Sequence, residues 1–291
     1  MHVLLIGCGY LGLRAALSWR EQGHRVTALT RHPSRIPDWT KQGIEAIVGD
    51  VVQPASLTQL PAADLCLYAV GYDRTGTADK RSVYVDGVEN VLREIRTRVP
   101  RLIFISSTSV YGQESGETID EFSRCEPSSE SGIICRDAEK MVQELYPVQD
   151  ATPSAVILRS AGLYGPGRLI ARQEQLKLQT PLPGRPDAWL NLIHVDDAVQ
   201  AIQKQSQRPF ADPVYLLSDE RPLTRSEFYG AIAERIGAPE PLFVPGDDNS
   251  LNKRCQSMRI REALSLNLKY PNAIVALDEL IGLAPGAGCP R

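Results

Sequence analysis

Three glycines near the N-terminus have the spacing of a phosphate-binding turn. The apolar residues 3–6 run directly into residues 7–12, which read G-C-G-Y-L-G, and a helix-like segment follows. In such a turn Gly7 permits the tight bend, Gly9 lets the backbone approach a pyrophosphate, and Gly12 lets the helix pack against the strand. The alternative is a turn whose small residues serve packing only. The candidate cofactor-binding residues here are Gly7, Gly9, Tyr10, Leu11 and Gly12.

The end of the next apolar run, residues 26–29, bears on the choice of dinucleotide. NAD-binding turns place an acidic residue about 20 residues after the glycines, where it holds the ribose hydroxyls. Here Thr30 and Arg31 take that place, with Arg35 close behind, so no carboxylate is expected there. Guanidinium groups suit a 2′-phosphate. NADP(H) is therefore favoured, and NAD(H) is the alternative if both arginines are solvated surface charges.

Hydroxyl groups follow another apolar run, residues 102–105. Ser106 is a cofactor-contact candidate, and Ser107 and Thr108 could polarise a substrate carbonyl. The same hydroxyls could instead bond to the local backbone. Tyr164 comes after a later strand, and it could face substrate or pack in the interior.

Two more apolar runs end in turns that could contact a cofactor. Residues 44–48 lead to Asp50, whose carboxylate could accept from an adenine amino group or cap the following turn. Residues 65–70 end at a glycine. Since ligands of open parallel sheets bind at the carboxyl ends of the strands, both turns are candidates. Their candidate residues are Asp50, Val51, Ala69, Val70 and Gly71.

Strands that alternate with amphipathic helices must position these residues, and they predict an α/β fold: a Rossmann-like, doubly wound parallel sheet with a small C-terminal lobe. We expect residues 1–165 to form the NAD(P)-binding domain, with its sheet completed by about 187–218. Residues 166–186 and 219–291 form the smaller substrate-binding lobe, and 114–131 a surface loop. The expected strands are 3–6, 26–29, 44–48, 65–70, 102–105, 155–158 and 214–217, and the expected helices include 81–99, 133–146, 168–178 and 224–236.

Composition narrows the class of protein. The chain has 291 residues, 43% of them hydrophobic and 23% charged, with a formal net charge of −3. Without blocks of like charge, nucleic acid and anionic membranes are unexpected partners, and a small-molecule substrate is expected. No apolar run is long enough to span a bilayer, and we expect a cytoplasmic protein. Six scattered cysteines without a C-x-x-C pair predict reduced thiols and no metal site; they are Cys8, Cys66, Cys125, Cys135, Cys255 and Cys289.

Five motifs occur together in one order, and the chain resembles the NAD-dependent epimerase/dehydratase family, the extended branch of the short-chain dehydrogenase/reductase superfamily. They are the glycine turn, 49–51, 106–112, 164–167 and 193–198. The resemblance implies that the turn and Asp50 bind the dinucleotide and that Ser107 polarises the substrate carbonyl. It also implies that residues 160–163, among them Ala161 and Gly162, line the nicotinamide, and that the C-terminal lobe binds substrate, often a nucleotide sugar. A homodimer formed through helices 81–99 and 133–146 is implied too.

The chain departs from that family at its acid/base pair, a Tyr four residues before a Lys. None of the ten tyrosines has a lysine at the fourth position after it. Alignment on Glu139 places Ser131 where the Tyr is expected and Cys135 where the Lys is expected, and Lys140 is a poor substitute. The chain therefore resembles atypical members of the superfamily. His194 could be an acid or base, but its position before two aspartates favours a helix start capped by an aspartate.

Two functions follow from these observations. The first is an oxidoreductase or epimerase that moves a hydride between NADP(H) and a polar carbonyl or hydroxyl substrate without the usual Tyr/Lys pair, a nucleotide sugar being one candidate. The second is a non-catalytic NADP(H)-binding sensor or regulatory protein on the same fold. The hydroxyl cluster favours the enzyme, and the missing pair favours the sensor.

Overall fold

The chain folds into two compact units. The computed structural model describes residues 1–73, 75–149, 152–246 and 251–282. Unit 1 comprises residues 1–110, 125–159 and 199–215, and unit 2 comprises 111–124, 160–198 and 216–291. The segment 111–124, expected with the cofactor domain, thus belongs to the second unit. It contains a short strand, β6 (Glu117–Ile119), where a loop was expected.

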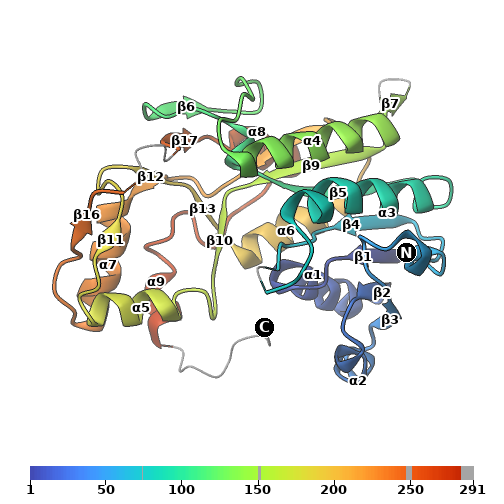
Figure 1. The fold of residues 1–291 in the computed structure, drawn as a ribbon, viewed down its shortest axis with the longest axis horizontal. Helices are drawn as coiled ribbons and strands as arrows, with labels where there is room; N and C mark the ends of the chain where they lie inside the picture. Colours follow the sequence, from blue (N-terminus) through green and yellow to red (C-terminus); the bar gives the residue numbers. More distant parts are fainter. Residues whose placement is uncertain (74, 150–151, 247–250, 283–291) are drawn as a thin grey trace. The chain divides into compact units, whose positions relative to one another are not determined.

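A seven-stranded sheet carries the cofactor half of the chain, as predicted. Its order is β14-β9-β5-β4-β1-β2-β3, and the registers from β3 through β5 are all parallel (Figure 1). Its strands are short apolar runs, which suits a sheet covered on both faces. They are β1 (His2–Ile6), β2 (Arg25–Thr30), β3 (Glu45–Val48), β4 (Leu65–Tyr68), β5 (Leu102–Ser107), β9 (Ala155–Ser160) and β14 (Val214–Leu217).

The order of the strands reverses beside β1. From β1 the chain adds β2 and β3 on one side, and it then returns to add β4 and β5 on the other. Parallel sheets bind ligands at such a switch point, at the carboxyl ends of the strands. Because these strands are parallel, the residues that follow β1, β2, β3, β4 and β5 all lie along one edge of the sheet.

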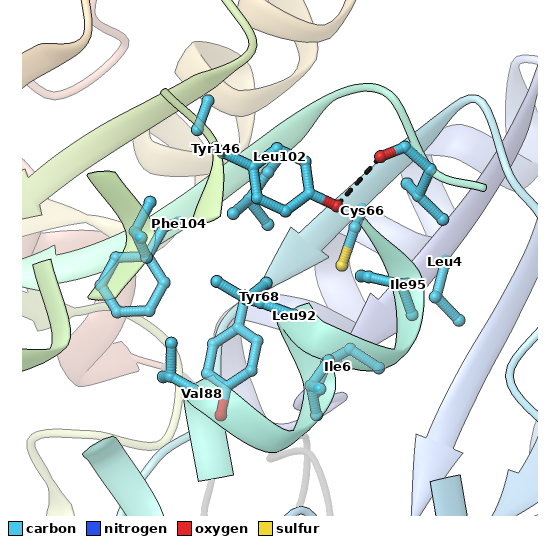
Figure 2. Packing of buried hydrophobic residues seen from close by; sticks show 14 of the residues in the cluster. Leu4, Ile6, Cys66, Tyr68, Val88, Leu92, Ile95, Leu102, Phe104 and Tyr146 are labelled. Carbon is cyan, nitrogen blue, oxygen red and sulfur yellow. Dashed lines mark hydrogen bonds between the residues drawn. The ribbon is translucent and has the colours of Figure 1, made fainter. Parts of the chain in front are cut away.

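Two helices, α3 (Gly87–Ile95) and α4 (Glu130–Leu145), cover one face of this sheet. Their apolar side chains pack on alternate residues of the strands, as Figure 2 shows for Val88, Leu92 and Ile95 of α3. The Tyr146 hydroxyl donates to the backbone oxygen of Val99, 2.9 Å away, which closes the end of this core (Figure 2). The core consists of residues from β1, β4 and β5 and from both helices, including Leu4, Ile6, Cys66, Tyr68, Leu102, Phe104, Ala138 and Val142.

Helix α1 (Tyr10–Glu21) packs on the other face. A side chain placed on Gly12 would lie 3.7 Å from Leu5, which points away from the α3 side of β1. Trp19 of α1 is fully buried, and its ring nitrogen donates to the Ser206 hydroxyl at the end of α6 (Val195–Ser206). The remaining elements of unit 1 are η1 (Pro33–Arg35), α2 (Ile36–Lys41), η2 (Pro54–Leu57), η3 (Ser82–Asp86), η4 (Thr108–Val110), β7 (Val148–Gln149) and β8 (Thr152–Pro153).

Unit 2 is built from short strand pairs and helices around its own apolar core. Helix α7 (Arg225–Ile236) has a capping box at its N-cap residue Thr224: the Thr224 hydroxyl accepts from the Glu227 amide, and the Glu227 carboxylate accepts from the Thr224 amide. No helix of the described residues is long and apolar enough to cross a membrane. The other elements are β10 (Gly162–Tyr164), α5 (Ile170–Lys177), β11 (Leu182–Pro183), β12 (Trp189–Leu190), β13 (Leu192–His194), β15 (Leu223–Thr224), β16 (Phe243–Val244), β17 (Lys253–Cys255), α8 (Met258–Leu264) and α9 (Leu277–Gly282).

The helix expected over 81–99 is shorter and less regular than its apolar spacing suggests. A π-helical turn, η3, precedes α3, and the α-helix ends at Ile95. A side chain on Gly87 would lie 2.7 Å from Val51, so the start of α3 presses directly on the turn after β3. The wider π turn lets the chain enter the helix at this crowded point.

A buried ion pair fixes the end of β5 to its neighbours. The carboxylate of Glu139 in α4 is fully buried and accepts from the Arg159 guanidinium of β9 at 2.7 and 2.9 Å. It also accepts from the Ser106 hydroxyl at 2.7 Å and from Arg136 at 3.1 Å. These four groups join β5, β9 and α4 at the sheet edge where ligands bind.

Replacement of Arg159 by alanine should lower the free energy of unfolding by about 3–5 kcal/mol, since it leaves the Glu139 charge buried without its main partner. Urea denaturation measures this. The control is Arg93→Ala, which removes an exposed pair with Glu89 and should cost less than about 1 kcal/mol. Equal, small losses in both variants would show that the buried pair does not hold the sheet edge.

Candidate functional site

The glycine turn is shaped by backbone contacts that exclude side chains at two positions. Gly7 has a φ of +96°, and a side chain there would lie 2.4 Å from the carbonyl carbon of Ala69. A side chain on Gly12 would lie 2.2 Å from the Gly7 oxygen. Gly9 is different, because a side chain there would meet no protein atom within 4 Å. The free space at Gly9 is where a ligand can reach the backbone.

The first turn of α1 adds backbone amide groups that have no acceptor within the helix. Gly9 is the N-cap residue, no side chain caps the helix, and no acidic residue lies in its first turn. The N–H groups and the positive end of the helix dipole are therefore available to an anion. This arrangement fits the diphosphate of a dinucleotide, with the turn after β4 (Ala69, Val70 and Gly71) alongside.

One of the two predicted arginines contacts the glycine turn, and the other pairs with a carboxylate. The Arg35 guanidinium is 3.5 Å from the backbone oxygen of Cys8, inside the glycine turn. Arg31 forms an ion pair with Asp73 at 3.1 Å, and both side chains are about one-third exposed. The expectation that no carboxylate is available here was therefore wrong. The sequence did not signal Asp73 because it comes 42 residues after Arg31, in a loop without periodicity.

The two predicted residues after β3, Asp50 and Val51, form hydrogen bonds with other residues of the protein. The Asp50 carboxylate accepts from the Val52 amide at 3.1 Å, so it caps its own turn, the alternative role considered above. Val51 is buried against the start of α3, and its backbone oxygen accepts from Asn90 at 3.0 Å. Thr30, at the end of β2, is also buried, and its hydroxyl accepts from the His32 amide at 3.0 Å.

The hydroxyl cluster at the end of β5 divides into two roles. The Ser106 hydroxyl donates to buried Glu139, so this side chain serves the buried ion pair. The Ser107 hydroxyl accepts from the Ser109 amide at 3.1 Å, the local bond expected as the alternative to carbonyl polarisation. That bond leaves the Ser107 proton available for donation. Thr108 follows in the short helical turn η4.

A second contact missed by the sequence lies next to this cluster. The Lys80 ammonium donates to the hydroxyl of Ser131, the residue aligned with the missing tyrosine. Burial raises the pKa of the Cys135 thiol, opposed by a hydrogen bond with Ser109 and by the Lys80 charge. Lys80 was not recognised because it precedes the apolar repeat of its helix and comes 51 residues before Ser131.

The predicted residues Ala161, Gly162 and Tyr164 lie in unit 2. Tyr164 is buried, and its ring packs edge-on against His194, with centroids 5.1 Å apart. Its hydroxyl has no hydrogen-bond partner among the described residues. Burial raises the pKa of this phenol, so Tyr164 is a weaker acid than an exposed tyrosine.

His194 has a structural role, but the predicted aspartate cap was wrong. His194 Nδ1 accepts from the Asp196 amide at 3.2 Å, so the histidine caps α6. Asp197 instead accepts from the amides of Lys269 and Tyr270, at 2.7 and 3.0 Å. The Tyr270 ring stacks on His194 with centroids 3.9 Å apart.

Asp219 is the second buried carboxyl of this cluster. Burial raises its pKa to about 8, although the backbone amides of Arg221 and Ala273 bond to it and oppose the shift. Its Oδ1 has no hydrogen-bond partner among the described residues. An acid held neutral in the fold and ionised in the unfolded chain makes stability depend on pH.

The Asp219 contribution to stability should be complete below about pH 4 and should be lost as pH rises towards about 8, at ~1.4 kcal/mol per pH unit. In thermal melts, the melting temperature of Asp219→Asn should therefore rise relative to that of the wild type between pH 5 and pH 8. Asp278→Asn, which alters an exposed carboxyl paired with Arg235, is the control and should stay parallel to the wild type. Parallel curves for Asp219→Asn would contradict a neutral carboxyl.

The described part of the chain contains neither a cluster of metal-ligating side chains nor a disulfide. No group of three or more His, Cys, Asp or Glu side chains there could hold a metal ion. No disulfide links the five cysteines in those ranges, and Cys66 is fully buried. Cys289 lies outside the described residues.

The chain is similar to known proteins over nearly its whole length. YeeZ of Escherichia coli K12 is 29% identical over 281 residues, which cover 94% of this chain and 97% of YeeZ. A putative NAD-dependent epimerase/dehydratase from Methylobacillus flagellatus is 29% identical, with a TM-score of 0.77 over 96% of this chain and 97% of its own.

A more distant solved structure shares the fold. DesIV, a dTDP-glucose 4,6-dehydratase from Streptomyces venezuelae solved with NAD and TYD bound, is 18% identical, with a TM-score of 0.81 over 97% of this chain and 96% of its own. The model of the NAD dependent epimerase/dehydratase family matches residues 3–215, from β1 into β14. With the glycine turn, the switch point beside β1 and this match, the chain belongs to the NAD dependent epimerase/dehydratase family.

Proposed function

We propose that this protein binds NADP(H) and transfers a hydride between it and a polar carbonyl or hydroxyl substrate. The observation that carries the proposal is the glycine turn, with open space at Gly9 and Arg35 beside it. Arg31 directly follows β2, at the same edge of the sheet. When bound, the cofactor supplies or accepts the hydride. The residues of this chain hold the diphosphate at the N-terminus of α1 and the 2′-phosphate at Arg31 and Arg35.

Asp73 sets the strength of the 2′-phosphate site. Its carboxylate partly neutralises Arg31, and it repels a dianionic phosphate more than it repels a ribose hydroxyl. The site therefore combines one arginine engaged by Asp73 with Arg35 at the turn. NADPH is the preferred cofactor in this proposal, by a margin smaller than two unengaged arginines would give.

The substrate in this proposal is a polar carbonyl or alcohol, with a nucleotide sugar as the leading class. Support comes from the family and from the nucleotide-linked relative described above, which shares only the fold. In this proposal the Ser107 hydroxyl polarises the substrate oxygen; its proton is not used in its bond to Ser109, which supports this role. Orientation of the two reactants supplies much of the rate in such a transfer.

A cofactor-binding sensor is the second candidate. It is favoured by one feature, Ser131 and Cys135 in the places of the usual Tyr and Lys. Such a protein would bind NADPH but would not transfer its hydride to any carbonyl compound. A panel of aldehydes, ketones and nucleotide-linked keto sugars, followed by loss of NADPH absorbance, separates the two functions.

Arg35→Ala should weaken NADPH binding by about tenfold or more and change NADH binding little, because only NADPH carries the 2′-phosphate. Arg31→Ala should act in the same direction with a smaller effect, since Asp73 already engages Arg31. Fluorescence titration of each variant with both nucleotides measures this.

Asp73→Asn is the matched variant for the same titrations. It keeps the loop and removes the charge, so it should tighten NADPH binding severalfold and leave NADH binding nearly unchanged. Equal effects of all three substitutions on the two nucleotides would contradict the 2′-phosphate site. Binding of neither nucleotide by the wild type would contradict the proposed function as a whole.

Gly9→Ala should reduce binding of both nucleotides at least tenfold while the melting temperature stays near that of the wild type. The added methyl group meets no protein atom and occupies the space required by the diphosphate. Gly230→Ala, where a side chain also meets nothing within 4 Å, is the control and should bind both nucleotides normally. Full binding by Gly9→Ala would place the ligand elsewhere.

A further inference from the structure

A lysine and a serine from distant parts of unit 1 meet beside the hydroxyl cluster. The Lys80 ammonium donates a hydrogen bond to the Ser131 hydroxyl, and both side chains are half-buried. Lys80 comes just before η3, and Ser131 lies in the first turn of α4. A half-buried serine hydroxyl bonded to an ammonium has an immediate source of a proton.

Close packing holds this pair at the carboxyl end of β5. A side chain on Gly132 would lie 2.3 Å from the Ser109 backbone oxygen, so the start of α4 rests directly on the turn that follows Ser107 and Thr108. The Ser129 hydroxyl caps α4 by accepting from the Gly132 amide at 3.2 Å. Ser131 therefore cannot move away from the hydroxyl cluster without disrupting the helix start.

The other charged or titratable groups around Lys80 leave its ammonium directed at Ser131. Asp79 is occupied by Ser82, whose hydroxyl donates at 2.7 Å, and Asp137 is paired with Arg81 at 2.9 Å and with Lys140 at 3.1 Å. Cys135 lies one turn beyond Ser131, and burial raises the pKa of its thiol. Tyr84, which Cys135 influences, accepts from the Tyr72 amide at 3.0 Å.

We propose that Ser131 is the proton donor of the hydride transfer and that Lys80 is the positioning residue that resupplies its proton. The inference rests on the proposed function and adds the acid that the family's Tyr/Lys pair would otherwise provide. It is built on the contact between Lys80 and Ser131 and on their fixed place beside Ser107.

Reduction of a carbonyl by this pair moves one hydride and a chain of protons. The substrate carbonyl carbon gains a hydrogen and two electrons from the reduced cofactor, and the former π-electron pair moves to the carbonyl oxygen. That oxygen takes the proton of the Ser131 hydroxyl, and the Ser131 oxygen takes a proton from the Lys80 ammonium. Neutral Lys80 then regains a proton from water. Oxidation of an alcohol runs the same transfers in reverse.

The test uses Ser131→Ala, Lys80→Ala and Lys80→Arg, with Lys140→Ala as control. Lys140 lies on the same helix as Ser131, but its exposed ammonium pairs with Asp137. NADPH titrations come first and should give wild-type affinity for all four variants. The carbonyl compound from the panel that the wild type reduces fastest is then used for kcat and its pH profile.

Ser131→Ala should lower kcat about 100-fold or more, and Lys80→Ala about tenfold or more, with Lys140→Ala unchanged. Lys80→Arg should restore part of the rate and move the loss of activity at high pH to a higher pH, because a guanidinium keeps its proton there. A purely structural contact would not move the pH profile.

A second measurement needs no turnover. Acetylation with an N-hydroxysuccinimide ester, followed by peptide mass spectrometry, should label Lys80 several times faster in Ser131→Ala than in the wild type, with Lys140 labelled equally in both. A wild-type kcat in Ser131→Ala, or unchanged labelling of Lys80 in that variant, would overturn the roles of Ser131 and Lys80. The proposed function would still stand in that case, as long as the wild type binds NADPH and turns it over. Binding of NADPH with reduction of no compound overturns the hydride transfer, and the proton donor with it.

Discussion

Backbone-to-backbone contact at the glycine turn is the constraint on which unit 1 depends. The chain after β1 passes so close to the end of β4 that Gly7 has no room for a side chain, and α1 starts so close to the turn that Gly12 has none either. Both contacts lie where the strand order reverses. The same closeness that packs the helix on the sheet leaves its first amides pointing into the space at Gly9. Stability and ligand binding therefore arise from one piece of geometry, and they cannot be altered separately at Gly7 or Gly12.

Much of the fold could be predicted because each central strand is a short apolar run and each long helix shows one apolar face. The capping box at Thr224 and Glu227 was predictable for the same reason: its signal lies within four residues. Strands of only two or three residues, such as the paired β6 and β17, are too short to show an apolar pattern in the sequence. They join segments that are far apart in the sequence.

The site was predictable where it depends on local sequence and not where it depends on loops. The glycine turn is encoded in six consecutive residues, whereas Asp73 and Lys80 reach Arg31 and Ser131 from a segment without periodicity. His194 shows a further limit, because helix caps are expected from Asp or Ser, and the imidazole nitrogen here does the same work.

The strand order also sets the order in which the sheet can assemble during synthesis. Each strand after β1 pairs with one that has already left the ribosome: β2 with β1, β3 with β2, β4 with β1, β5 with β4, β9 with β5 and β14 with β9. No gap has to be held open for a strand made later. The sheet can therefore grow outward from its first strand as the chain emerges. Once β3 has formed one edge, every later strand is added at the other edge.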